Sequence, residues 1–237
     1  MSPGLARHNV LLAFGVVLMV LLMAALATGL QSEAALAKCE PNRSPASGTY
    51  FDGWKRVPGQ NVYGAAARIF NYSPWVYPGS VVTAFSMFNY GLDRWAQVGW
   101  VEFPYDSRWT YAQWKDSSGT TQTHYYPPQP LNSYSYYTVV YNQSLGKFYF
   151  YIAGSLVDTA NASFAPNAAR VSGETHNLKD QMPGGYNYKE DFFDSQLFYG
   201  GWWQPLDGTK INYSDAYYGW ERISSTYLRI WDKACAN

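Results

Sequence analysis

Charged side chains are scarce in this chain, and neither sign dominates. Of its 237 residues, 17 are basic and 17 are acidic, so the formal net charge is zero. Charged residues make up 14% of the chain, compared with roughly 25% in an average soluble domain. A nucleic-acid-binding protein needs a basic stripe that neutralises phosphates, so we predict no nucleic-acid partner. Two cysteines are also too few for a disulfide-dense scaffold.

The motifs of several hydrolase classes are missing as well. There is no Gly-x-Ser-x-Gly elbow, no His-Glu-x-x-His and no pair of cysteines or histidines at zinc spacing. The Asp-Thr-Ala at 158–160 lacks the glycine of an aspartic-protease motif. Glu190, Asp191 and Asp194 form a small acidic cluster, which is more typical of a solvated loop than of a calcium site. We therefore predict neither a metal ion nor a cofactor.

One long apolar run covers residues 10–30, shortly after Arg7 and His8, and a small-x-small sequence follows at 35–37. This layout predicts a secretory signal peptide over residues 1–37. Because the run is long enough to span a bilayer, an uncleaved membrane anchor is the alternative, and only then do we expect a membrane partner. Both interpretations place the rest of the chain outside the cytoplasm, as a secreted or extracellular protein.

The two cysteines, Cys39 and Cys235, lie at opposite ends of the remaining chain. In an oxidising compartment we expect them to form a disulfide that closes nearly the whole domain into one loop. Two free thiols are the alternative interpretation.

Aromatic residues are abundant, with 10 Trp, 22 Tyr and 12 Phe. Apolar residues do not repeat at the helical period over three turns, whereas short β-branched and aromatic runs alternate with turn signals. We predict strands at 76–88, 95–103, 109–114, 120–126, 136–141, 147–152, 155–158, 169–175 and 227–231. Many short strands at near-regular spacing indicate an all-β protein, as an antiparallel sandwich or barrel.

We interpret residues 38–61 as a short leader and residues 62–237 as one β-sandwich domain. In the predicted strand 147–152, Phe148, Phe150 and Ile152 share one face, and two tyrosines share the other. One face is expected to enter the core. Because each tyrosine hydroxyl needs a partner when it is buried, the surplus of tyrosines indicates an aromatic-walled cleft.

Two segments carry the candidate chemistry. The first is the strand 95–103, in which Gln97 shares a face with Trp95 and Val101. An uncharged amide in so apolar a run needs hydrogen-bond partners or a catalytic task. The second is the segment 172–176, in which Glu174 ends a strand of small and apolar residues.

These two segments resemble the glutamic peptidases, the clan that joins the eqolisins and the neprosin family. Gln97-Val98-Gly99-Trp100 is similar to their Gln-x-Gly or Glu-x-Gly-Trp strand, and Gly173-Glu174 is similar to the neprosin Gly-Gly-Glu strand. The resemblance covers roughly residues 62–204. Further matches are the first segment of the neprosin domain, at 64–79, and its later hairpins, at 119–123, 137–141 and 147–154. The Gln-Met and Gly-Gly pairs at 181–185 also match.

The resemblance implies a concanavalin-like antiparallel double-sheet β-sandwich, a jelly roll, with a substrate groove on a concave face. It also implies catalytic residues on neighbouring strands, which fall here on Gln97 and Glu174. Eqolisins carry glutamine at the first position and neprosins carry glutamate, so this chain has the eqolisin residue. The implied activity is that of a secreted, acid-acting endopeptidase on polypeptide substrates, without metal or cofactor.

In this interpretation Glu174 takes a proton from the attacking water, and Gln97 positions that water and donates to the developing oxyanion. Tyr111 is a candidate polar contact, and His176 shares the strand face of Glu174. The remaining candidates for substrate binding are groove walls at Trp95, Trp100, Trp109 and Trp114.

Two other functions compete with the peptidase. The surplus of Tyr and Trp also suits a non-catalytic carbohydrate-binding sandwich at the cell surface, with a polysaccharide as its partner. A structural domain held by an uncleaved anchor is the third interpretation. Geometry separates the first two, because a lectin does not require Gln97 and Glu174 to converge.

Overall fold

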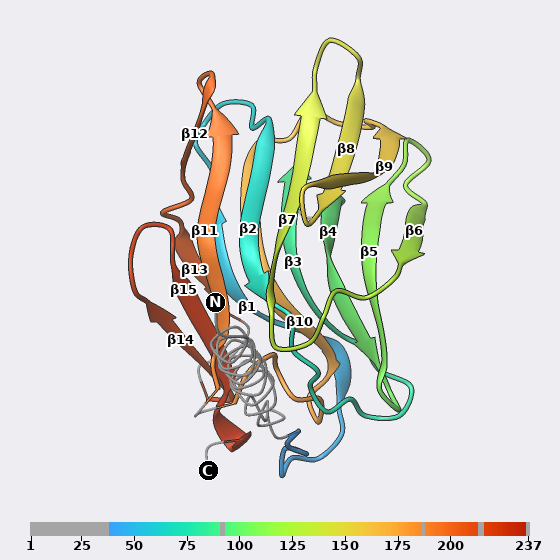
Figure 1. Ribbon diagram of the computed structural model, residues 1–237, viewed down its shortest axis with the longest axis vertical. Helices are drawn as coiled ribbons and strands as arrows, with labels where there is room; N and C mark the ends of the chain where they lie inside the picture. Colours follow the sequence, from blue (N-terminus) through green and yellow to red (C-terminus); the bar gives the residue numbers. More distant parts are fainter. Residues whose placement is uncertain (1–37, 91–92, 186–187, 213–215, 236–237) are drawn as a thin grey trace, which may run out of the picture. The chain divides into compact units, whose positions relative to one another are not determined.

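A computed structural model describes residues 38–90, 93–185, 188–212 and 216–235. The predicted signal peptide or anchor at 1–37 lies outside the described residues. The described part is β structure and loops, apart from one 3₁₀ turn at Lys233–Cys235. Its strands form two antiparallel sheets, which confirms the predicted all-β, double-sheet sandwich (Figure 1). Among these residues, no helix is long and apolar enough to cross a membrane.

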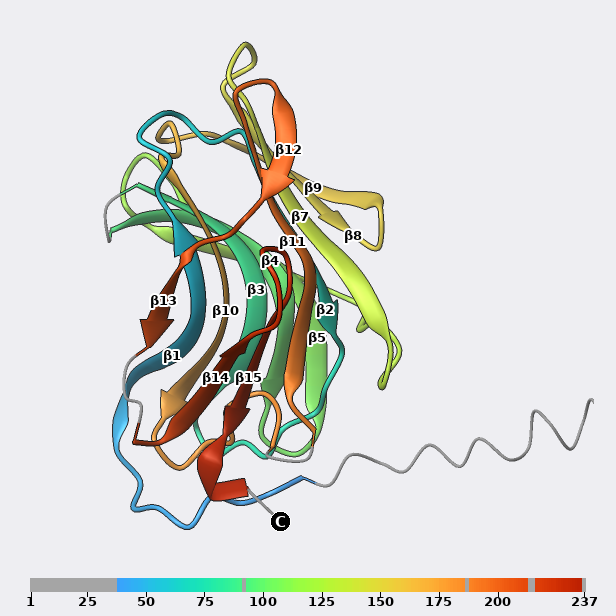
Figure 2. The same ribbon diagram turned by 90° about the vertical axis from the view of Figure 1, so that its left-hand side faces the viewer.

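The first sheet has seven strands in the order β13-β1-β10-β3-β4-β5-β6. Their bounds are β13 (Thr209–Asn212), β1 (Ser47–Arg56), β10 (Ala168–Asn177), β3 (Val82–Tyr90), β4 (Arg94–Phe103), β5 (Ser107–Lys115) and β6 (Thr121–Tyr126). Strand β10 comes late in the chain, yet it lies between β1 and β3. Figure 2 shows β1, β10 and β3 bowed, with the hollow of the curve facing away from the second sheet.

The second sheet runs in the order β14-β15-β11-β2-β7-β8-β9, and β12 adds to β11 outside this order. Its strands are β14 (Tyr218–Arg222), β15 (Leu228–Asp232), β11 (Glu190–Tyr199), β2 (Gly64–Phe70), β7 (Tyr134–Asn142), β8 (Lys147–Ile152), β9 (Ser155–Asn161) and β12 (Trp202–Pro205). The predicted alternation in β8 is confirmed, because Phe148, Phe150 and Ile152 are buried while the two tyrosines are half-buried.

The main core fills the space between the sheets with large side chains, including Trp54, Trp100, Phe88, Tyr137 and Phe150. A second, smaller apolar cluster lies on the outer face of the first sheet. It consists of Phe85, Met87, Val101 and Tyr111, flanked by Val81, Trp95 and Phe103. Because side chains alternate between the two faces of a strand, β3, β4 and β5 each supply both clusters.

Two glycines allow a close approach of strands in the first sheet. A Cβ atom at Gly99 would lie 2.0 Å from the carbonyl oxygen of Ala84, and one at Gly53 would lie 2.2 Å from that of Val171. Both glycines belong to one register row, opposite Phe85 and Ser172 respectively. The row therefore has no side chains at two positions on the outer face of the sheet.

The expected leader, residues 38–61, contains strand β1, which pairs with both β10 and β13. The sheet therefore draws on chain before residue 62. The predicted disulfide between Cys39 and Cys235 is present. It joins the start of the described chain to its end, across a sequence separation of 196.

Buried polar groups fasten the same end of the domain. The carboxylate of Asp232 pairs with Arg43 and accepts hydrogen bonds from the backbone N–H groups of Met182 (3.1 Å) and Ala234 (2.9 Å). Gln181 Oε1 accepts from the backbone N–H groups of Trp75 (2.9 Å) and Cys39 (3.2 Å). The Gln-Met pair at 181–182 thus has a structural role, because its hydrogen bonds hold the two ends of the described chain to the domain.

Candidate active site

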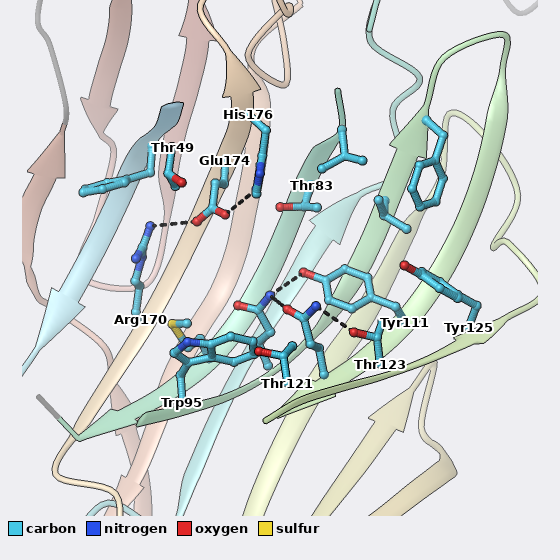
Figure 3. A pocket seen from close by; sticks show the side chains of 17 residues that line it. Thr49, Thr83, Trp95, Tyr111, Thr121, Thr123, Tyr125, Arg170, Glu174 and His176 are labelled. Atoms are coloured by element: carbon cyan, nitrogen blue, oxygen red, sulfur yellow. Dashed lines mark hydrogen bonds and ion pairs between the residues drawn. The ribbon is translucent and has the colours of Figure 1, made fainter. Parts of the chain in front are cut away.

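A cleft with a volume of about 540 Å³ lies on the outer face of the first sheet. Strands β1, β3, β4, β5, β6 and β10 all contribute to its lining (Figure 3). The predicted residues Trp95, Gln97, Tyr111, Glu174 and His176 line it together. The two segments singled out by the sequence therefore meet in one cavity.

Gln97, on β4, is 7% exposed and holds a chain of side-chain hydrogen bonds. Its Nε2 donates to the hydroxyl of Tyr111 (3.1 Å) and to Oε1 of Gln113 (2.8 Å). Gln113 Nε2 in turn donates to Oγ1 of Thr123 (2.8 Å). This series of hydrogen bonds runs along one row of the sheet, since Gln97 lies opposite Gln113, and Gln113 lies opposite Thr123. Both amide protons of Gln97 are already in use.

Glu174, on β10, lies between two basic side chains (Figure 3). Its Oε1 is 3.0 Å from Nε2 of His176, and its Oε2 is 3.9 Å from Nη2 of Arg170. The hydrogen bond to Glu174 raises the pKa of His176, against the opposing effect of burial. Two basic side chains therefore flank the carboxylate on β10, with Arg170 before Glu174 in the strand and His176 after it.

Register decides how Gln97 and Glu174 are related. The resemblance implied neighbouring strands, but β3 lies between β4 and β10. Glu174 lies opposite Thr83, whereas Gln97 lies opposite Met87, four residues further along β3. With strands about 4.8 Å apart and residues about 3.3 Å apart, their Cα atoms are roughly 16 Å apart along the sheet. The two side chains share one face and one cleft without being cross-strand neighbours.

The hydroxyl of Tyr111 points from β5 toward the side of the cleft that carries Glu174 (Figure 3). It accepts a hydrogen bond from Gln97 (3.1 Å). Burial raises the pKa of Tyr111 well above its usual value, and the negative charge of Glu174 raises it further. The hydroxyl therefore keeps its proton and can donate it to a ligand.

Two of the predicted groove walls lie in the core instead. Trp100 and Trp114 point between the sheets, where Trp100 Nε1 donates to the carbonyl oxygen of Phe70 (2.9 Å) and Trp114 packs against Phe150. The prediction was wrong because both rings sit at strand positions of the opposite parity from Gln97 and Tyr111. Trp109 shares the outer face but is 42% exposed and does not line the cleft.

Sequence reasoning missed Arg170, Phe51 and Gln113, all of which line the cleft. A signal for Arg170 was present, because positions 170 and 174 fall on the same face of a strand. Phe51 lies in the expected leader, so only the pairing of β1 with β10 brings it here.

The acidic cluster is part of strand β11 rather than a solvated loop. Glu190 is 1% exposed, and both of its carboxylate oxygens are buried without a hydrogen-bond partner. The adjacent Asp191 accepts from the hydroxyls of Tyr134 and Tyr227 and from Nε of Arg229. The described residues contain no group of three or more His, Cys, Asp or Glu that could hold a metal ion.

Comparison with known proteins gives a likeness of fold. No protein-family model matches the chain, and no curated protein matches it. The crystal structure of scytalido-glutamic peptidase with a peptide-based transition-state analogue aligns with 79% of this chain and 100% of its own, at 12% identity and a TM-score of 0.61. The eqolisin-family peptidase SCP-B, in a complex with the tripeptide Ala-Ile-His, aligns over the same shares at 12% identity and a TM-score of 0.60. The described chain thus has the fold of these glutamic peptidases.

Proposed function

We propose that this protein is a peptidase of the glutamic type, which hydrolyses polypeptides in the cleft on the first sheet. The observation that carries the proposal is the joint placement of Gln97 and Glu174 in one cleft. The fold supports it, since the two structures compared above are glutamic peptidases that align over their full length. Those peptidases are bound to a peptide-based analogue and to a tripeptide, which supports a polypeptide as substrate.

Glu174 acts as the general base in this proposal. A water molecule attacks the scissile carbonyl carbon and gives one proton to the Glu174 carboxylate. The tetrahedral intermediate then collapses, the C–N bond breaks, and Glu174 returns the proton to the leaving amine nitrogen. His176 orients Glu174 through their 3.0 Å contact.

The oxyanion is stabilised by Tyr111 and Gln97 acting in series. Both amide protons of Gln97 are engaged, one of them on the Tyr111 hydroxyl. Accepting that bond polarises the phenol and strengthens the hydrogen bond that its own proton makes to the carbonyl oxygen. Gln97 therefore acts through Tyr111, which refines the direct contact expected from the sequence.

We further propose that the enzyme is secreted, works in acid and is related to the neprosins. Four buried carboxyl groups support the acidic condition, because burial raises the pKa of each. They are Glu102, Asp180, Glu190 and Asp232. A carboxyl group whose pKa is raised by folding stabilises the fold more at low pH than at neutral pH.

The test is proteolysis of an unfolded protein by the purified enzyme at about pH 3 and about pH 7, with and without a chelator. We expect chelator-insensitive cleavage that is faster in acid. Glu174→Gln should abolish it, and Tyr111→Phe and Gln97→Ala should each lower the rate by about 10²–10³. Trp109→Phe, on the same face outside the cleft, is the matched control and should retain activity. A folded wild-type enzyme that cleaves nothing at any pH would refute the proposal.

Carbohydrate binding is the second candidate function. One observation favours it, namely that aromatic rings line the cleft at Phe51, Trp95, Phe103, Tyr111 and Tyr125. Such rings stack on sugar faces as well as on apolar side chains. If proteolysis is absent, titration of polysaccharides against the intrinsic tryptophan fluorescence tests this candidate, and Trp95→Ala should abolish the signal.

A further inference from the structure

Arg170 is a buried cation in the cleft that the proposed reaction leaves unassigned. Its guanidinium lies over the rings of Phe51 (4.5 Å) and Phe85 (5.3 Å), and its side chain is only 14% exposed. Nη2 donates to Oγ of Ser172 (3.0 Å), and Nε is buried without a hydrogen-bond partner. The side chain is therefore held rigidly at the wall of the cleft, with donor capacity to spare.

The charge of Arg170 is only partly neutralised. Among the residues that line the cleft, Glu174 is the one acidic side chain, and it serves both Arg170 and His176. The carboxylate lies nearer to His176, at 3.0 Å, than to Arg170, at 3.9 Å. Burial also lowers the pKa of Arg170. A buried guanidinium without a full counter-charge favours an incoming anion, and a carboxylate matches its planar fork.

Register places this cation beside the proposed reaction centre. Arg170 lies opposite Met87, and Met87 lies opposite Gln97, so Arg170 and Gln97 share one row. Their Cα atoms are about 10 Å apart at the usual strand spacing. An extended peptide covers that distance in about three residues, at about 3.3 Å each. A substrate that reacts near Gln97 and Glu174 therefore brings a neighbouring residue against Arg170.

We propose that Arg170 forms a carboxylate-binding subsite of the cleft, which selects polypeptides with a carboxylate within about three residues of the cleaved bond. The carboxylate comes from an Asp or Glu side chain or from the C-terminus of the substrate. This inference rests on the proposed peptidase function.

Matched peptides test the subsite. One set carries Glu or Gln at successive positions beside the cleaved bond, and a second set ends in a free carboxylate or in an amide there. Wild type should cleave the acidic member of a pair with a kcat/KM about tenfold or more higher. Arg170→Met should remove the preference while still cleaving the neutral peptides, and Arg170→Lys, which keeps the charge but loses the fork, should retain part of it. Arg94→Met, which removes an exposed cation on β4 outside the lining, should leave the preference unchanged.

The outcomes separate the two proposals. If wild type cleaves none of the peptides, the peptidase function fails. If it cleaves acidic and neutral peptides equally, or if Arg170→Met slows both by the same factor, the subsite alone is refuted and Arg170 serves to position Glu174. A preference confined to the free C-terminus identifies that group as the ligand, and a preference confined to internal Glu identifies the side chain.

Discussion

At the scale of single residues, two glutamates on strands have contrasting surroundings. Glu174 faces the cleft between two basic side chains and is available for proton transfer. Glu190 faces the interior, where the negative charge of Asp191 adds to the cost of burial. Burial first, and then that charge, raise the pKa of Glu190 well above its usual value. The same residue type is therefore a candidate base in one place and a buried core group with a raised pKa in the other.

Glu190→Gln tests this contrast through the pH dependence of stability. A carboxyl group whose pKa is raised by folding stabilises the fold below its unfolded pKa, and this stabilisation is lost as pH rises through the folded pKa. Glutamine stays neutral, so the variant should melt at a higher temperature than wild type at pH 8 and at nearly the same temperature at pH 4. Each kcal/mol gained raises the melting temperature by about 2–4 °C.

Asp191→Asn is the matched control for that measurement. Asp191 accepts three hydrogen bonds on the outer face, so its removal should destabilise the fold at neutral pH. Thermal melts of the three proteins by circular dichroism give the comparison. Equal stability of Glu190→Gln and wild type at pH 8 would contradict the interpretation of Glu190 as a costly buried carboxyl.

At the scale of elements, strand β4 serves the core and the site at once. Ala96, Val98 and Trp100 point between the sheets, while Gln97 and Val101 face the cleft. Gly99 lies in the middle of the strand, where β3 approaches too closely for any side chain. The position of Gln97 over the cleft thus depends on the packing of its own strand.

Gly99→Ala should destabilise the domain. The added methyl group would lie 2.0 Å from the carbonyl oxygen of Ala84, so the backbone has to shift. Overpacking of this kind costs about 1–3 kcal/mol. Gly119→Ala is the control, because no atom lies within 4 Å of its Cβ position and only the left-handed φ of 82° is unfavourable. Urea unfolding should show the larger loss for Gly99→Ala, and a larger loss for Gly119→Ala would contradict the steric argument.

At the scale of the whole domain, the Cys39–Cys235 disulfide and the buried contacts of Arg43 and Asp232 hold the two ends of the described chain together. Strand β1, near the first cysteine, forms one side of the cleft through Phe51. Closure of the ends and integrity of the cleft are therefore linked through β1.

Replacement of both cysteines by serine should lower the free energy of unfolding by about 2–5 kcal/mol, since the crosslink restricts a long loop in the unfolded chain. Wild type in a reducing buffer should show the same loss in urea unfolding. A double variant as stable as oxidised wild type would show that the buried polar contacts alone close the domain.

Sequence patterns by themselves determined the β class, the two faces of the strands that they predicted and the only intramolecular disulfide that the chain could form. The faces follow from the alternation of side chains, and two cysteines allow only one intramolecular pairing. The resemblance of two sequence segments to the glutamic peptidases also indicated Gln97 and Glu174 as a candidate pair. Only the tertiary structure decided which face of a strand meets the core. It alone shows that Trp100 and Trp114 lie in the core and that the carboxyl group of Glu190 is buried. It also placed β10 between β1 and β3, so that β3 separates Glu174 from Gln97 and Arg170 lies in the row of Gln97. Strand β10 pairs with β1 and β3, which lie far from it in the sequence, and no local pattern encodes these pairings.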